Sequence, residues 1–191
     1  MESQVDHELS IEEDLVEVDE HNMIHGSVKR YRVRKEGIWH RASYIYVMNS
    51  KGELCIHLRK MTKDFCPGYW DLCAGGCIQY GETDHENAKR ELEEEYGIKG
   101  YELEFVSSFK YADDKNKCWG SVFFVSHSGK IIIQEEEIDE YRWVSLEDIQ
   151  NEYIDDPDVK VTPDSSYILK TMKEHYSHLF TSKGKKKTVI K

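Results

Sequence analysis

Short apolar runs separated by turn residues recur along most of the chain. The β-branched and aromatic residues of 43–48 predict a buried strand, and 53–59 returns across the turn from Asn49 to Gly52 as its hairpin partner. Segment 15–26 has the pattern of a small hairpin. Further strands are predicted over 101–111, 118–125, 131–133 and 141–144, and a short strand after residue 70 leads toward Gly76.

Helical signals are clearest between residues 84 and 96. A capping box of Thr83 and Glu86 marks the start of this helix, and Gly97 supplies a left-handed stop. Two further helices are predicted after the last strand, over 145–151 and 162–180.

The segment 29–35 is basic, with Tyr31 and Val33 between its charged residues. A short amphipathic helix is one interpretation of this pattern. The other is a contact for an anionic substrate. The sequence leaves both interpretations open.

Strands before and after one well-marked helix are typical of a mixed sheet covered by helices, in an α/β or α+β arrangement. At 191 residues the chain fits one domain with a substantial core, which we place at residues 12–180. We expect the polar residues 1–11 to be disordered and the basic residues 181–191 to form a flexible tail.

Composition limits the kinds of partner. The net charge of −11 argues against binding of a nucleic acid polymer, which requires a basic face. No apolar run approaches the roughly 20 residues that a membrane helix needs. Five cysteines are an odd number, and with no apolar leader after Met1 they indicate free thiols in a reducing cytoplasm. Cys73 and Cys77 could supply two ligands of a zinc site, but no second pair of Cys or His residues stands at zinc spacing.

Three carboxylates share one face of the helix predicted over 84–96. Glu91, Glu94 and Glu95 are spaced i, i+3 and i+4, so their side chains project together. Like charges at this spacing destabilise a helix by roughly 0.2–0.5 kcal/mol per pair. Such a face either binds a divalent cation or is ordinary solvated surface, and spacing alone does not decide between the two.

The surrounding positions narrow this choice. The segment from Gly76 to Ile98 resembles the Nudix box at every defining position. It consists of Gly76, five residues, Glu82, seven residues and then the run Arg90-Glu91-Leu92-Glu93-Glu94-Glu95-Tyr96-Gly97-Ile98. The resemblance spans 23 residues and is far more specific than a lone glycine motif. It implies an α/β/α sandwich and a hydrolase that cleaves a diphosphate linkage in a small molecule, such as a nucleoside diphosphate derivative or a related metabolite.

The resemblance also implies roles for individual residues. Glu91, Glu94 and Glu95 would bind Mg²⁺ or Mn²⁺ together with the carbonyl oxygen of Gly76, which agrees with the preference of hard cations for oxygen ligands. Glu94 is expected to be essential for turnover. Arg90 would orient the Glu94 carboxylate through a charge-assisted hydrogen bond.

The general base is less narrowly defined. The candidates are a carboxylate of the helix and the acidic run Glu135, Glu136 and Glu137. We prefer Glu137 because it lies nearest the final strand, and a solvated acidic loop is the alternative. The sequence does not identify the substrate, and it leaves open whether the chain forms a homodimer.

Three looser runs extend the similarity to about residues 12–180: His40-Arg41-Ala42, Lys63 to Gly68, and Thr162-Pro163-Asp164. They resemble the Nudix branch related to isopentenyl-diphosphate isomerase. The isomerases have a cysteine directly before the box glycine and a histidine directly after it, whereas this chain has Gly75 and Cys77.

A glutamate-bearing motif that the isomerases have is also missing, because residues 116–119 contain no carboxylate. His40 aligns with a metal-binding histidine of the isomerases, but alone it does not form that site, and we expect a structural role. Hydrolysis is therefore the leading hypothesis. Isomerase activity and a non-catalytic, ligand-sensing module are the alternatives.

Overall fold

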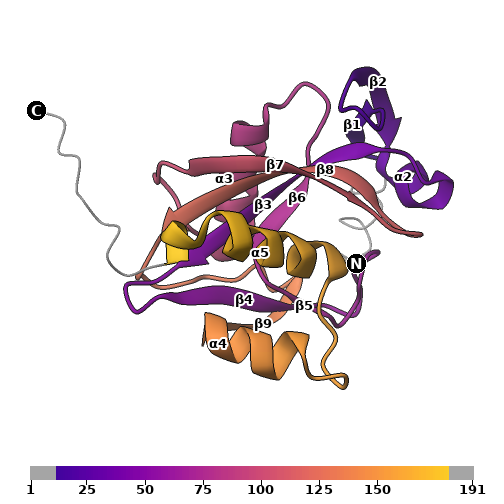
Figure 1. The fold of residues 1–191 in the computed structure, drawn as a ribbon. Coiled ribbons are helices and arrows are strands. Elements are labelled where there is room, and N and C mark those ends of the chain that lie inside the picture. Colours follow the sequence, from indigo (N-terminus) through magenta and orange to yellow (C-terminus); the bar gives the residue numbers. More distant parts are fainter. Residues whose placement is uncertain (1–11, 181–191) are drawn as a thin grey trace, which may run out of the picture.

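The computed structural model describes residues 12–180, and the predictions for residues 1–11 and 181–191 lie outside this part. Figure 1 shows the arrangement of its elements. The strands are β1 (Asp14–Val18), β2 (Ile24–Lys29), β3 (His40–Met48), β4 (Glu53–Arg59), β5 (Trp70–Asp71), β6 (Ala74–Cys77), β7 (Glu104–Ala112), β8 (Lys117–Ser126) and β9 (Ile138–Ser145). The helices are α2 (Arg30–Glu36), α3 (Asp84–Tyr96), α4 (Leu146–Asp148) and α5 (Pro163–His175), with a π-helical turn over Ile149–Ile154 and a 3-10 turn over Ser177–Phe180.

Strand β3 is the centre of the sheet. It pairs in parallel with β8 along its whole length, from His40 opposite Cys118 to Met48 opposite Ser126. Strands β6 and β1 pair with it antiparallel. A single pairing of Met48 with Leu54 joins β3 to β4, which pairs with β9 and β5. The sheet therefore has two parts that meet at one end, and α5 lies across the region between them (Figure 1), where its apolar residues share one core with those of β3 and β4.

Side chains alternate along β3 between two cores. Ile45 and Val47 belong to the core that contains the apolar residues of α3. Tyr44, Tyr46 and Met48 belong to the core that contains those of α5. Helices thus cover both faces of the sheet, which confirms the predicted α/β/α sandwich.

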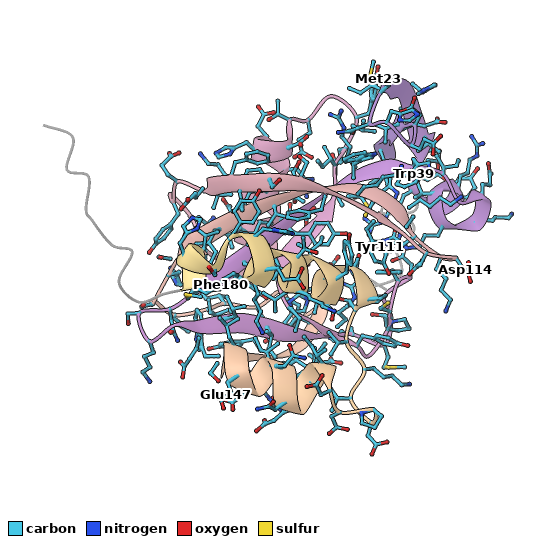
Figure 2. All side chains as sticks on the ribbon, in the orientation of Figure 1. Met23, Trp39, Tyr111, Asp114, Glu147 and Phe180 are labelled. Atoms are coloured by element: carbon cyan, nitrogen blue, oxygen red, sulfur yellow. The ribbon has the colours of Figure 1, made fainter. Side chains whose placement is uncertain are left out.

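Aromatic contacts fix the position of α5 on the sheet. Figure 2 places Tyr111 and Phe180 toward opposite ends of this helix. The ring of Tyr111 lies 5.6 Å from that of Tyr167 in α5, and the ring of Phe180 lies 6.1 Å from that of Phe124 in β8. Both distances lie in the favourable range for aromatic pairs.

Helix α3 begins and ends where the sequence predicts. Glu86 N–H donates to Thr83 Oγ1 at 3.2 Å, and Thr83 N–H donates to Glu86 Oε2 at 2.9 Å, which completes the capping box. At the other end Gly97 adopts φ 66°, a left-handed conformation that favours glycine. The apolar face with Ala88 and Leu92 is buried against the sheet.

The predicted strand over 131–133 is wrong. These residues run along the C-terminal end of α3, where Ile132 N–H donates to Tyr96 O at 3.0 Å and Gln134 N–H donates to Glu95 O at 3.2 Å. The last carbonyls of a helix have no intrahelical donor. The segment therefore bonds to α3 rather than to a strand, and Ile131 is buried in the same core as α3.

The other helices differ from prediction only at their ends. The basic segment is helical, as α2, and ends at Gly37 with φ 65°. The helix that follows Ser145 continues as the π-helical turn to Ile154. The final helix stops at His175 instead of near residue 180, and the short 3-10 turn follows it.

All five cysteines are free thiols, as predicted. Four of them, Cys55, Cys73, Cys77 and Cys118, are buried. Among the helices of residues 12–180, none is long and apolar enough to cross a membrane.

Candidate active site

One cavity collects most of the residues that the sequence singled out. It is lined by parts of α2, α3, β3 and β6, by the segment after β4 and by the loop before β9. Its walls include Gly76, Arg90, Glu91, Glu94 and Glu137. Glu95, the remaining predicted residue, lies behind this wall with 3% of its surface exposed.

The three carboxylates of α3 differ in their exposure. The side chain of Glu94 is 47% exposed, whereas that of Glu91 is 14% exposed. Burial raises the pKa of Glu91 to about 7, with added repulsion from Glu94 and Glu137. Burial and the nearby Glu91 raise the pKa of Glu95 well above its usual value. A bound cation would relieve both effects.

Two glycines let β6 approach these carboxylates. A Cβ atom on Gly76 would lie 2.5 Å from Glu91 Oε1. Gly75 N–H donates to Glu95 Oε2 at 3.0 Å, and a Cβ atom on Gly75 would lie 2.0 Å from the carbonyl oxygen of Ser43. Glycine at 75 is therefore required by the close pairing with β3, and a side chain at 76 would displace the Glu91 carboxylate.

Arg90 connects the carboxylates of the box. Its Nε donates to Glu82 Oε1 at 2.9 Å. Its Nη1 lies 2.8 Å from Glu94 Oε2 and 2.9 Å from Glu91 Oε1. Asn87 Nδ2 also donates to Glu82, at 3.0 Å. The guanidinium group is therefore held at one end and positions two of the predicted metal ligands at the other.

The donor atoms of this face suit a hard divalent cation. Carboxylate and carbonyl oxygens are the ligands that Mg²⁺ prefers. In the described part of the chain, no three His, Cys, Asp or Glu side chains already surround a common point. Arg90 holds Glu91 and Glu94, while Glu95 accepts the Gly75 N–H. Glu91, Glu94, Glu95 and the Gly76 carbonyl stay the predicted ligands for Mg²⁺ or Mn²⁺.

Glu137 reaches the cavity from the loop before β9. Its carboxylate accepts a hydrogen bond from Lys63 Nζ. Although burial acts in the opposite direction, Lys63 holds the pKa of Glu137 below its usual value. Glu135 and Glu136 are exposed and do not line the cavity. Of the three loop candidates for a general base, Glu137 alone borders the site.

Cations from other segments line the same cavity: Arg30 and Arg34 from α2, Arg59 from the end of β4, and Lys63. Against the effect of burial, His40 and the two α2 arginines lower the pKa of the Cys77 thiol to about 6. The basic segment is thus a helix whose Arg30 and Arg34 also border the site. The interpretation as a short helix is confirmed, and the interpretation as a contact for an anionic substrate stays a prediction.

His40 is buried, with 1% of its surface exposed. Its Nδ1 lies 3.4 Å from the carbonyl oxygen of Ile38, a local partner. No second histidine lines the cavity among the described residues. A structural role for His40 fits this environment.

A buried polar cluster that the sequence did not predict borders the cavity at the start of α5. Tyr44 OH donates to Asp164 Oδ2 at 2.9 Å, and Asn116 Nδ2 donates to the same oxygen at 3.2 Å. Burial raises the pKa of Asp164, and the negative charge of Asp71 adds to the shift. In the sequence Asp164 is an ordinary first-turn carboxylate. No local signal shows that this helix start is enclosed.

The family model and two curated relatives that match this chain belong to one family. The sequence model of the NUDIX domain matches residues 38–165. The uncharacterized Nudix hydrolase PA4841 of Pseudomonas aeruginosa is 40% identical over 130 residues, which cover 68% of this chain and 77% of that protein. The uncharacterized Nudix hydrolase YfcD of Escherichia coli K12 is 36% identical over 132 residues, which cover 69% and 73%.

Solved structures show the same fold at lower sequence identity. DR0079 from Deinococcus radiodurans matches with a TM-score of 0.70 and 22% identity, over 83% of this chain and 98% of that one. The MutT protein from Methanosarcina mazei Go1 matches with a TM-score of 0.59 and 24% identity, over 71% and 94%. With the family match and the curated relatives, these observations show that the chain belongs to the Nudix hydrolase family.

Proposed function

We propose that this Nudix hydrolase uses Mg²⁺ or Mn²⁺ to cleave the diphosphate linkage of a nucleoside diphosphate derivative or a related metabolite. The observation that supports it most strongly is the close placement of the enclosed Glu91 and Glu95 carboxylates beside the Gly75–Gly76 backbone. Enclosed carboxylates at this spacing are costly unless a cation compensates them.

The residues around the carboxylates divide the work. When bound, the divalent cation supplies charge neutralisation for the phosphates and lowers the pKa of an attacking water. Arg90 positions Glu91 and Glu94. Glu137, kept ionised by Lys63, is our candidate for accepting the proton of the water.

A panel of diphosphate compounds tests the activity. Wild-type protein with Mg²⁺ is expected to release monophosphates from at least one member, and EDTA is expected to abolish the reaction. Absence of turnover on every nucleoside and non-nucleoside diphosphate, with Mg²⁺ or with Mn²⁺, would contradict the proposal.

Substitution of Glu94 tests the residue assignment on whichever compound is cleaved. We expect Glu94→Gln to lower kcat by at least about 100-fold while the thermal unfolding midpoint changes little. Glu93→Gln is the matched control because Glu93 is 49% exposed and pairs with Lys99 instead of bordering the site. Equal activity of the two variants would remove Glu94 from the mechanism.

The similarity to the isomerase branch stays a prediction, and the reaction of that branch is not expected. Gly75 and Cys77 replace the isomerase cysteine and histidine, and Asn116 stands where the glutamate-bearing motif would begin. Wild-type protein incubated with isopentenyl diphosphate should yield no dimethylallyl isomer. Formation of that isomer would overturn the assignment to hydrolysis.

We also infer that the protein works in a reducing compartment such as the cytoplasm. All five cysteines are free thiols, which is typical of proteins that are kept reduced.

A further inference from the structure

Helix α2 adds two arginines to the cavity from outside the region that the family model matches. The helix covers Arg30–Glu36, whereas the match begins at residue 38. Arg30 and Arg34 are four residues apart, so their side chains project from the same face. Both border the cavity with Glu91 and Glu137, and their side chains are only 20% and 22% exposed.

These two guanidinium groups are short of acceptors. Arg30 Nη1 donates to Glu13 Oε2 at 2.8 Å, but its enclosed Nε has no hydrogen-bond partner. Arg34 has neither its Nε nor its Nη1 satisfied, and the nearest carboxylate oxygen, Asp64 Oδ2, is 3.7 Å from Nη1. Enclosed donors left unpaired cost about 1–3 kcal/mol each, and more when charged.

The other cations of the cavity are compensated directly. Arg59 Nη1 donates to Asp71 Oδ2 at 3.3 Å, and Lys63 donates to Glu137. Arg90 bonds to Glu82 and to Glu94. Arg30 pairs with Glu13, whereas Arg34 has no carboxylate of the described residues within hydrogen-bond distance, and both arginines lie 3.7–3.8 Å from Asp64 Oδ2. The unpaired guanidinium donors of this cavity therefore lie on α2, at Arg30 Nε and at Arg34 Nε and Nη1.

Arg34 is also held in place without an acceptor. Its guanidinium carbon lies 4.3 Å from the centre of the Phe65 ring, in a cation–π contact. This contact holds the group at the wall of the cavity, where its Nε and Nη1 have no acceptor from the described part of the protein. A guanidinium fork of this kind matches the oxygens of a phosphate, which accept two parallel hydrogen bonds.

We propose that Arg30 and Arg34 form an anion subsite that binds the phosphate of the substrate diphosphate lying away from the carboxylates of α3. The identity of the ligand rests on the proposed function. The subsite itself rests on the unpaired donors. A diphosphate would then be held from two sides, through a cation on the acidic helix and directly by arginines on the basic one.

Phosphate binding without metal tests the subsite separately from hydrolysis. Full-length protein in EDTA is titrated with inorganic phosphate and with methylenediphosphonate in a calorimeter, at low and at moderate salt. Wild type is expected to bind both probes, more weakly as salt increases. Arg34→Gln should weaken binding by at least about tenfold, because the charge and the fork are lost.

Two further variants separate binding from folding. Arg34→Lys keeps the charge but not the fork, so it should fold and bind with intermediate affinity. Arg32→Gln is the matched control, because Arg32 is on the same helix but is 44% exposed and pairs with Glu36. It should bind the probes like wild type.

The outcomes are distinct. Loss of phosphate binding in Arg34→Gln but not in Arg32→Gln supports the subsite even if no diphosphate is hydrolysed. If wild type binds neither probe, or if all variants bind them equally, the two arginines only hold the Asp64–Phe65 segment in place and the subsite is wrong, whether or not hydrolysis occurs.

Discussion

Helices α3 and α2 border the same cavity with opposite charges, and they are supported in different ways. On α3, Arg90 bonds to Glu91 and Glu94, and the Glu91 carboxylate lies directly beside Gly76. The arginines of α2 are enclosed but only partly paired. The acidic side is organised by bonds within the protein, whereas the basic side keeps donors that no residue of the described chain satisfies.

The two helices also differ in their position relative to the residues that the family model matches. The acidic helix lies within the matched residues 38–165, and α2 lies before them. Arg90 orders Glu91 and Glu94, while burial still raises the pKa values of Glu91 and Glu95, and this combination suits a site that a cation completes. Unpaired donors suit a subsite that is completed by the substrate.

The largest effect is expected where the acidic side depends on close contact. Gly76→Ala would place a Cβ atom 2.5 Å from Glu91 Oε1 and displace that carboxylate. Displacement of a reacting group by about 1 Å costs on the order of 100-fold in rate, so kcat/KM should fall by at least that factor. Steady-state kinetics on a cleaved diphosphate measures it. Unchanged kinetics would show that the Glu91 position is not critical.

A smaller loss is expected when the organising arginine is changed. Arg90→Lys keeps the charge but removes the fork that reaches Glu82 and Glu94 together. Substitution of a residue that hydrogen-bonds to metal ligands typically lowers metal affinity or activity by about 10–100-fold. The Mg²⁺ concentration for half-maximal rate should therefore increase. Arg32→Lys, which alters the exposed Arg32–Glu36 pair of α2, should leave it unchanged.

The smallest effect concerns stability and pH. The pKa of Glu91 is raised from 4.5 to about 7, so the folded protein favours the protonated form. Its contribution to stability is present below the unfolded pKa of 4.5 and is lost as the pH rises through about 7. In EDTA, Glu91→Gln should therefore unfold roughly 2–6 °C above wild type at pH 8 and close to it at pH 5.

The thermal unfolding midpoints of wild type and Glu91→Gln at pH 5 and pH 8 measure this difference. Groups that titrate in both proteins contribute equally and cancel in the comparison. Adding Mg²⁺ at pH 8 should stabilise wild type more than Glu91→Gln. A difference that stays constant from pH 5 to pH 8 would show that Glu91 is not enclosed as an uncompensated acid.

The sequence predicted the acidic side more fully than the basic side because its signals are local. Thr83, Glu86 and Gly97 set the limits of α3, and the spacing of its carboxylates follows from helix geometry. For α2 the pattern of the basic segment indicated a helix as one of two interpretations, and it did not show which arginines enter the cavity. That depends on Glu13, just before β1, and on the Asp64–Phe65 segment, which are distant in sequence.

Long-range contacts explain the remaining differences. The apolar run at 131–133 has the composition of a strand, yet its N–H groups bond to the end of α3. Asp164 opens a helix that is enclosed by Tyr44 and Asn116, both far away in the chain. In each case the deciding partner belongs to another element, and composition near the residue does not reveal it.

We propose above all that the acidic face of α3 binds the divalent cation on which hydrolysis depends. Titration with Mn²⁺, followed by electron paramagnetic resonance of the free ion, tests it directly on wild type, Glu91→Gln, Glu94→Gln and the outward-facing Glu93→Gln. We predict saturable binding to wild type and to Glu93→Gln, and affinity at least about tenfold weaker in the other two. Equal Mn²⁺ affinity in all four proteins would contradict the account.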